Sequence, residues 1–394
     1  MEKPRDALVL GAGISGCSLA FHLAQRGLVA TVYDPRTPAA GATGRSAGLL
    51  TEQLWDRWDV DLVRETRKEY AELAAAYDPS AYRRTGFLRI ATAPVAVELL
   101  GEAAARWRSW GIDVEEPRRS EIARLVPALN LEGIGAAVFT PSDGVVDPSS
   151  IATTYAEAAR KGGATFDFGL PTVSLDHRDG VWELRTATGT IRAVRLVVAA
   201  GAWSKSIVRS VGHPLPLAPY RTQAALLKPP GPRGPDPPAV HDLDLDVYLR
   251  PELEGRLLAG DGTEDREADP ESFASEGDET FLAHLAETME QRFPAWRDSE
   301  VAGSWAGVCT ATPDRRPVIG TLDGARSLYV IGGFNGFGVM RAAGAARRLA
   351  DLIADGPSAS GPLAPARPDR FPEPEVTFRP RPGFTVEAGD DPRY

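Results

Sequence analysis

The sequence predicts an α/β protein in which a parallel sheet with helices is interleaved with a second, antiparallel α+β part. An apolar run at residues 7–10, a helically spaced stretch at 15–26 and a second apolar run at 29–33 predict a βαβ unit. Alternating apolar and polar residues at 181–184 and 190–196, joined by a short turn, are typical of antiparallel strands. With 394 residues, 43% of them hydrophobic, the chain is long enough for two interleaved domains.

The remaining elements follow in order along the chain. We expect a helix over 60–76, a mixed region to about 130, a helix over 151–161, a central strand over 195–200, a helix over 281–293, a strand over 327–331 and a last helix to about 353. Six prolines between Lys228 and Val240 exclude a central strand there, because proline has no N–H to donate. Residues 262–280 are predicted to be an acidic connection, and the chain beyond Gly356 a tail that wraps the surface or is partly disordered.

Charge and composition exclude several classes of partner. A net charge of −10 repels nucleic acid and anionic lipid surfaces. The opening apolar run is too short for a secretory leader or a membrane span, so we expect a cytoplasmic protein. Cys17 and Cys309 are far apart and are predicted to be reduced thiols, and the five scattered histidines do not have the spacing of a metal site.

A glycine motif follows the first predicted strand. Gly11, Gly13 and Gly16 form a GxGxxG pattern at the start of a predicted helix, where glycines let backbone amides approach a pyrophosphate. Asp34 ends the second strand 18 residues after Gly16, where a carboxylate accepts hydrogen bonds from an adenosine ribose. Together they predict a dinucleotide site, although the motif alone does not distinguish NAD from FAD.

Five further segments bear on that distinction. They are residues 41–50 (GATGRSAGLL), 143–148 (DGVVDP), 197–203 (VVAAGAW), 305–320 with its Thr312-Pro-Asp, and 332–339 (GGFNGFGV). In order and spacing they resemble the superfamily of D-amino-acid oxidase, glycine oxidase and sarcosine oxidase (the DAO superfamily). Sarcosine oxidase-like and sarcosine dehydrogenase-like members look closest. The resemblance covers nearly the whole chain and implies FAD as the cofactor.

The same resemblance implies a domain organisation and a set of cofactor residues. It implies a Rossmann-like FAD-binding domain of the glutathione-reductase type (1–80, 141–215, 300–356), an antiparallel substrate domain (81–140, 216–299) and a proline-rich C-terminal tail (357–394). The C-terminal glycine loop would aim backbone amides and a helix dipole at the flavin ring, where negative charge develops on reduction. The residues expected at the cofactor are Gly11, Gly13, Ile14, Ser15, Gly16, Asp34, Pro35, Thr43, Gly44, Arg45, Ser46, Ala47, Gly48, Leu49, Val173, Ala200, Gly201, Trp203, Gly307, Gly333, Phe334, Asn335, Gly336, Phe337, Gly338, Val339 and Met340.

The chain departs from the family where some members attach FAD covalently. Those members use a cysteine upstream of the Thr-Pro-Asp motif or a histidine in the N-terminal flavin loop. The matching positions here are Gly307 and Arg45, and Cys309 lies two residues too late. We therefore expect non-covalent, dissociable FAD.

The substrate side departs as well. Glu52 and Met340 stand at the positions where sarcosine oxidases bind the substrate carboxylate with arginine and lysine, and Cys309 stands at the arginine position of glycine oxidase. A buried carboxylate without a cationic partner is costly, so Arg45, Arg250 and Arg341 are the candidate replacements. Tyr248 matches a substrate-facing tyrosine of related enzymes. Leu258 matches the oxygen-activating lysine, which favours a dehydrogenase or a slow oxidase.

The resemblance implies oxidation of a carbon–nitrogen bond by hydride transfer to flavin N5, which gives an imine. The expected catalytic residues are Tyr248, Arg250, Met340, Arg341 and Glu52. We expect an N-alkyl or cyclic amino acid first and a neutral-tailed amine second, with oxygen or another electron acceptor and either a homo-oligomer or a partner subunit. Two alternatives stay open, a flavin monooxygenase-type enzyme and a non-catalytic FAD-binding subunit of an amine dehydrogenase complex.

Overall fold

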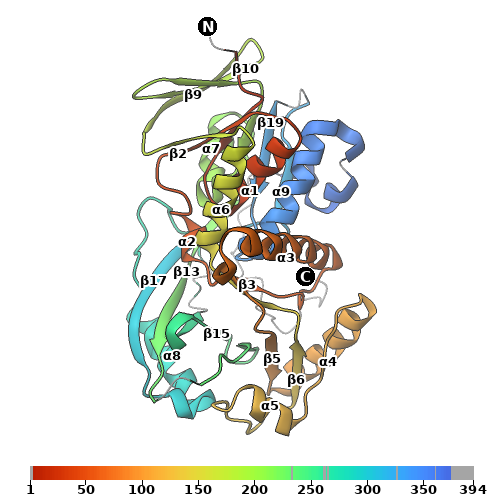
Figure 1. The fold of residues 1–394 in the computed structure, drawn as a ribbon, viewed down its shortest axis with the longest axis vertical. Coiled ribbons are helices and arrows are strands. Elements are labelled where there is room, and N and C mark those ends of the chain that lie inside the picture. Colours follow the sequence, from red (N-terminus) through yellow and green to blue (C-terminus); the bar gives the residue numbers. More distant parts are fainter. Residues whose placement is uncertain are drawn as a thin grey trace.

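The computed structural model describes residues 3–231, 234–260, 263, 266–324, 327–359 and 361–373. Two large sheets organise the chain (Figure 1). A six-stranded sheet and its helices form the upper half of that view, and a seven-stranded sheet forms the lower half. The predicted α/β class with an antiparallel second part is therefore confirmed.

The six-stranded sheet has the order β18-β19-β12-β1-β2-β8. Neighbouring strands are parallel except β18 and β19, which are antiparallel. Its strands are β1 (Ala7–Leu10), β2 (Ala30–Asp34), β8 (Thr165–Phe168), β12 (Leu196–Val198), β18 (Val318–Thr321) and β19 (Leu328–Gly332). β1 and β12 are buried along their whole length, because helices and sheet cover both faces of a parallel centre. The predicted βαβ unit and central strand are confirmed.

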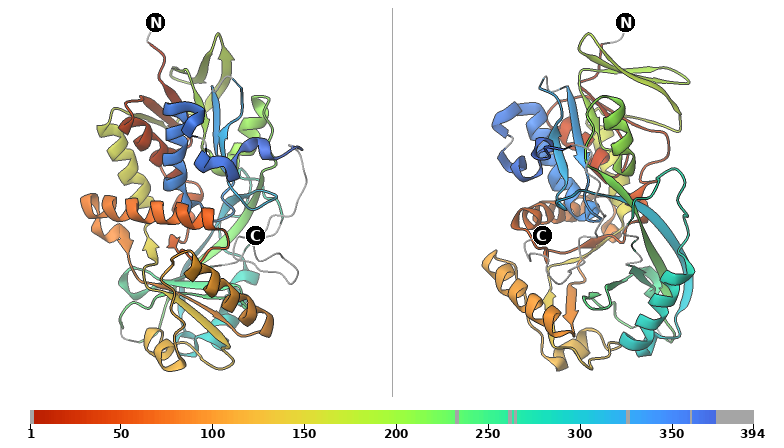
Figure 2. Two further views of the ribbon diagram at one scale, coloured as in Figure 1. Left: turned by 90° about the vertical axis from the view of Figure 1, so that its right-hand side faces the viewer. Right: turned by 180° about the vertical axis from the view of Figure 1, so that it is seen from behind.

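Three helices pack on this sheet, and a fourth, α3, packs on two of them (Figure 2). The four helices are α1 (Ile14–Gln25), α3 (Arg57–Tyr77), α6 (Pro148–Lys161) and α9 (Gly338–Asp355). α1 contacts both α6 and α9, and α3 contacts α9. All four were predicted from apolar residues at helical spacing.

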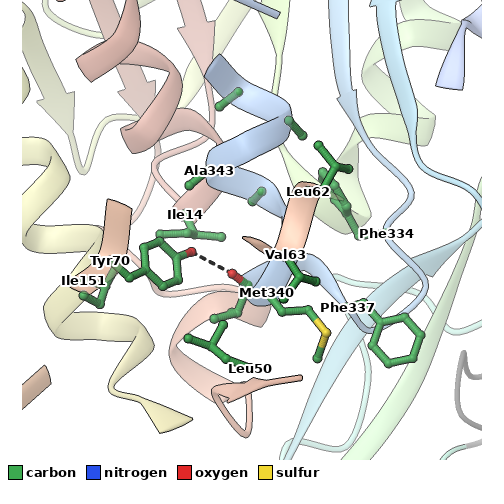
Figure 3. Packing of buried hydrophobic residues seen from close by; sticks show 14 of the residues in the cluster. Ile14, Leu50, Leu62, Val63, Tyr70, Ile151, Phe334, Phe337, Met340 and Ala343 are labelled. Carbon is green, nitrogen blue, oxygen red and sulfur yellow. Dashed lines mark hydrogen bonds between the residues drawn. The ribbon is translucent and has the colours of Figure 1, made fainter. Parts of the chain in front are cut away.

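A buried hydrogen bond fixes the start of α9 on α3. The Tyr70 hydroxyl donates to the Val339 carbonyl oxygen at 2.7 Å. Figure 3 shows this bond, with the side chains of Leu50, Val63 and Met340 around the first turn of α9. Carbonyl groups in a first helical turn accept bonds within the helix, so Tyr70 adds a second partner that ties α9 to α3.

The seven-stranded sheet has the order β17-β13-β16-β15-β14-β5-β6, antiparallel except for the pair β14 and β5. Its strands are β5 (Phe87–Ala91), β6 (Ala136–Thr140), β13 (Ala218–Lys228), β14 (Ala239–Asp242), β15 (Val247–Pro251), β16 (Leu257–Gly260) and β17 (Glu300–Ala311). A second apolar core, which includes Leu249, Phe281 and Phe293, joins this sheet to the helices α5 (Arg119–Leu125) and α8 (Glu279–Arg292). The helix α4 (Pro94–Ser109) contacts β5 and β6.

Two small sheets complete the fold. The strands β10 (Val181–Thr186) and β11 (Thr190–Ala193) form the predicted antiparallel pair at the top of Figure 1. The strand β9 (Thr172–Arg178), which was not predicted, pairs antiparallel with β10. The strands β3 (Leu49–Leu50), β4 (Tyr82–Arg83) and β7 (Gly144–Val146) join the two halves. The short helices α2 (Ala42–Arg45) and α7 (Ser204–Ser210) were not predicted.

The strand β17 pairs with β13 from Glu300 to Ala311, so it belongs to the seven-stranded sheet. The sequence-based division assigns residues 300–356 to the other domain. If sheet membership defines the domains, the boundary falls between β17 and β18.

The described part of the predicted tail forms three short 3-10 helices, Gly356–Ala359, Gly361–Ala366 and Pro368–Arg370, with Leu363 and Ala366 buried. Residues 232–233 of the proline loop, 262 and 264–265 of the acidic connection, and 360 and 374–394 of the tail lie outside the described residues. Within the described ranges, no helix is both long and apolar enough to cross a membrane. The same residues contain no cluster of His, Cys, Asp and Glu that would hold a metal ion.

Candidate functional site

A cavity of about 790 Å³ is lined by both large sheets. Segments far apart in the sequence form its walls: the turn after β1, residues 41–49, the 3-10 turn η2 (Gly201–Trp203), the loop 332–338 with the start of α9, and the strands β13 and β17. The glycine motifs identified in the sequence therefore meet at one site.

The turn after β1 requires glycine at two positions. Gly11 has φ +108°, and a Cβ there would lie 2.4 Å from the Ala199 carbonyl oxygen. A Cβ on Gly16 would lie 1.9 Å from the Gly11 oxygen. Because both positions exclude a side chain, α1 begins close against the sheet, with its N-terminus at the cavity.

Asp34 at the end of β2 holds this turn. One carboxylate oxygen accepts from the Ala12 amide at 2.9 Å and the other from the Arg36 amide at 2.9 Å. Asp34 also lines the cavity. Each carboxylate oxygen has more than one lone pair, so Asp34 can still accept bonds from a ribose.

The segment 41–49 lies against the same turn. Thr43 Oγ1 accepts a hydrogen bond from the Ile14 amide at 3.1 Å, which ties α2 to the start of α1. Arg45 Nη1 donates to the Ala40 oxygen at 2.6 Å. A Cβ on Gly307 of β17 would meet Arg45 Cβ at 3.2 Å, so this glycine leaves room for the arginine stem.

The C-terminal glycine loop is held by Asn335. Its Nδ2 donates to the Gly333 oxygen at 2.8 Å, and its Oδ1 accepts from the Thr312 amide at 3.0 Å. Gly333, Asn335 and Gly336 all have positive φ, at 68°, 53° and 86°. This conformation brings the chain to the cavity and starts α9 at Gly338, so the N-terminus of α9 faces the cavity.

The opposite wall is uncharged. In the register of β13 and β17, Tyr220 pairs with Cys309 and Thr222 with Gly307, and all four line the cavity. Burial raises the pKa of the Cys309 thiol to about 11, so it is neutral near pH 7. Tyr248 of β15 also lines the cavity, and its ring lies over Gly260, where a Cβ would be 2.1 Å from the hydroxyl.

The substrate-side candidates separate into two groups. Arg45, Tyr248 and Met340 line the cavity, although Met340 is mostly buried in the core. Glu52, Arg250 and Arg341 are not part of the lining.

Each of the three candidates outside the lining is buried with partners of its own. Glu52 forms ion pairs with Arg64, at 2.6 Å, and with Arg67. Arg250 pairs with Glu252 at 2.7 Å, and burial lowers its pKa while Glu252 opposes the shift.

Arg341 pairs with Asp59 and also donates to the Phe334 oxygen. We do not retain these three as substrate-facing residues, because their charged groups are already paired within the fold.

Most expected cofactor residues line the cavity. The exceptions are Gly16, Gly44, Gly48 and Val173, of which Val173 is 67% exposed, while its strand neighbours Thr172 and Leu175 line the cavity. Lining residues that the sequence reasoning missed include Arg36, Tyr220, Thr222, Glu271 and Thr310. Arg36 follows Asp34 by two residues, and Tyr220 and Thr222 alternate on one strand and so share a face. These sequence positions could have indicated that the three residues lie at the site. Nothing in the sequence marked Glu271.

Residues 6–352 match the profile of the DAO family, described as FAD dependent oxidoreductase. The chain belongs to this family. Mouse mitochondrial dimethylglycine dehydrogenase is 29% identical over 379 residues, covering 89% of this chain and 42% of that protein. Glycine oxidase of Geobacillus kaustophilus is 26% identical, covering 90% and 94%. The crystal structure of L-proline dehydrogenase from P. horikoshii has a TM-score of 0.86 at 25% identity, covering 96% and 100%. The chain thus spans about two fifths of the dimethylglycine dehydrogenase.

FAD is the cofactor of this family, and the cavity fits it. The excluded side chains at Gly11 and Gly16 leave the N-terminus of α1 open to a pyrophosphate. Asp34 lines the cavity where it can accept hydrogen bonds from the ribose. At the other end of the cavity, the N-terminus of α9 is the positive end of that helix's dipole. Among the described residues Thr310 Oγ1 is buried at the cavity without a hydrogen-bond partner, an atom that a bound cofactor can satisfy.

Proposed function

We propose that this protein oxidises the carbon–nitrogen bond of an amino acid or a secondary amine. One observation carries the proposal: a single cavity runs from the dinucleotide turn at Gly11 to the uncharged wall of Tyr220, Thr222 and Tyr248. Bound FAD supplies the two-electron acceptor. The names of the similar proteins support the substrate class, since dimethylglycine, glycine and proline are all amino acids.

The chain's own residues orient the reactants and exclude water. The amides of the loop 332–338 and of the start of α9 stabilise negative charge at that end of the cavity. Tyr248, Tyr220 and Met340 present rings and a thioether to the amine, so a neutral amine enters more readily than an ammonium ion. The amine carbon gives up a hydride, the nitrogen loses its proton, and water hydrolyses the resulting imine.

Arg45 is the proposed contact for a substrate carboxylate. The charged side chains in the described lining are Asp34, Arg36, Arg45 and Glu271. Arg36 lies beside Asp34 at the dinucleotide turn, whereas Arg45 lies against Gly307 of the substrate wall. Among the described residues Arg45 has no carboxylate partner, and one of its nitrogens is held by Ala40. This favours an amino acid, including N-alkyl and cyclic ones, over an amine that has no carboxylate.

An electron acceptor other than oxygen is favoured for the second half of the reaction. Leu258, which matches the oxygen-activating lysine of sarcosine oxidases, is buried in β16 outside the lining. Superoxide-like charge would therefore lack a fixed cation at that position. The rates at which air and an artificial acceptor re-oxidise the reduced protein test this, and the artificial acceptor is expected to be the faster.

Anaerobic mixing of the purified yellow protein with a substrate panel tests the function. The panel contains amino acids, N-methyl amino acids, proline and simple amines. Bleaching of the flavin by at least one of the first three classes is expected. Bleaching by dithionite but by no panel member contradicts the proposal.

A further inference from the structure

A described segment between β16 and α8 crosses one side of the cavity. We call residues 266–278 the strap; in Figure 1 it is part of the loop that rises beside β17 toward α2. Its first part is held by β13, because the Ala268 amide donates to the Pro219 oxygen at 2.8 Å. Its last part is held by β17, because the Ala306 amide donates to the Ser275 oxygen at 2.8 Å.

A buried arginine anchors the last part more firmly. Arg221 of β13 donates to the Ala274 oxygen at 3.0 Å and the Glu276 oxygen at 2.6 Å, and it pairs with Asp278 at 3.0 Å. Asp278 in turn caps α8 by accepting from the Phe281 amide. Both ends of the strap are therefore fixed to the substrate half of the molecule, and Glu267 near its start also pairs with Lys205 of α7 in the other half.

The middle of the strap contacts the other half. Glu271 lines the cavity and accepts a hydrogen bond from Trp203 Nε1 of η2. The Trp203 ring also makes a cation–π contact with Arg36, whose guanidinium carbon lies 3.8 Å from the ring centroid. The ring centroid of Phe273 lies 5.9 Å from the Arg45 guanidinium carbon. Trp203, Arg36 and Arg45 all line the cavity.

These middle contacts differ in kind from the anchors. Within the part of the chain that the structure describes, the backbone of residues 269–273 makes hydrogen bonds inside its own turn, where Asp269 accepts from the Glu271 amide at 3.0 Å. Its links across the cavity run through side chains, and Glu271 itself is exposed. A segment with few buried apolar contacts opens at low free-energy cost. The turn can thus swing away while Arg221 keeps the end of the strap in place.

We propose that residues 269–273 form a lid over the cofactor cavity, latched by Glu271 on Trp203, and that this latch sets the rate of FAD release. The lid closes the side on which Arg36, Trp203 and Arg45 meet, the side that carries the dinucleotide turn. This inference does not depend on which substrate the enzyme oxidises, because its readout is the cofactor alone.

The test measures FAD release from the holoprotein, followed by the rise of flavin fluorescence after dilution. Glu271→Ala is expected to release FAD about fivefold faster, since a hydrogen bond to a charged but exposed acceptor is lost. Trp203→Phe keeps a ring against Arg36 but removes the N–H, and the same acceleration is expected. Glu276→Ala is the matched control, because it removes a strap carboxylate whose side chain makes no described contact.

The double variant Glu271→Ala/Trp203→Phe makes the test decisive. If the two residues act through one bond, its release rate equals that of either single variant. Release from Glu271→Ala at the rate of Glu276→Ala overturns the latch. Multiplied effects in the double variant overturn it as well, since the two residues would then act separately.

Discussion

Asn335 accepts a hydrogen bond from the backbone amide of Thr312 through its side-chain oxygen, at 3.0 Å. This bond joins two motifs that the sequence shows separately, Thr312-Pro-Asp and the C-terminal glycine loop. Both groups are buried, so the bond is shielded from bulk solvent. The shape of the loop at the cavity therefore depends on one side chain.

Replacing Asn335 tests this dependence. Asn335→Gly accepts the positive φ without strain but loses the side-chain hydrogen bonds to Thr312 and Gly333, so the free energy of unfolding should fall by about 1–3 kcal/mol. Asn335→Asp keeps the acceptor for the Thr312 amide and should recover part of that loss. Thermal unfolding of the apoprotein and FAD titration measure the two effects. Equal stability of Asn335→Gly and the wild type would contradict the role.

Asp34→Ala should weaken FAD binding. The predicted ribose acceptor is removed, worth about 1.5–3 kcal/mol, which is a factor of ten or more in Kd. The structure adds that the Ala12 and Arg36 amides also lose their acceptor. Asp34→Asn keeps one oxygen for these amides and serves as the control. FAD affinity of the alanine variant equal to that of the wild type would show that the ribose assignment is wrong.

The flavin should be dissociable. The two family attachment positions carry Gly307 and Arg45, which pack against each other and offer no nucleophile to the flavin. Precipitation with acid should leave the yellow colour in the supernatant. A yellow pellet after denaturation would reveal a covalent bond and refute this expectation.

Arg45→Met should slow anaerobic flavin reduction by an amino acid more than tenfold, a loss of about 1.4 kcal/mol or more. The matching amine without a carboxylate should lose much less. Arg250→Met is the comparison, because Arg250 is paired with Glu252 outside the cavity and should affect stability rather than the amino acid preference. An equal loss for the acid and the amine in Arg45→Met would exclude carboxylate recognition by this residue.

Local patterns predicted the elements that carry the cofactor site. Gly11 and Gly16 are visible in sequence because close backbone approach leaves glycine as the residue that fits. Asn335 is visible because its neighbours Gly333 and Gly336 mark an irregular loop. The helices α1, α3, α6, α8 and α9 are visible from their apolar spacing.

Pairings between residues far apart in the sequence could not be predicted from local patterns. Arg341 follows Met340, yet its charge is paired with Asp59, 282 residues away. Glu52 was expected among the catalytic residues, and it forms ion pairs with two arginines of α3 instead. β17 pairs with β13 through contacts that no local pattern specifies. Such pairings depend on tertiary packing, which overrides local preference.

Single-turnover product analysis tests the central claim most directly. The protein with oxidised FAD is mixed anaerobically with its best amine or amino acid substrate, and the bleached flavin and the released carbonyl and nitrogen products are counted. Oxidation of the carbon–nitrogen bond predicts one carbonyl group and one ammonia or amino group for each FAD reduced, without oxygen; for a cyclic substrate the two groups are on the same molecule. Bleaching without these products, or a product that forms only when oxygen is present and carries an added hydroxyl, would contradict the account.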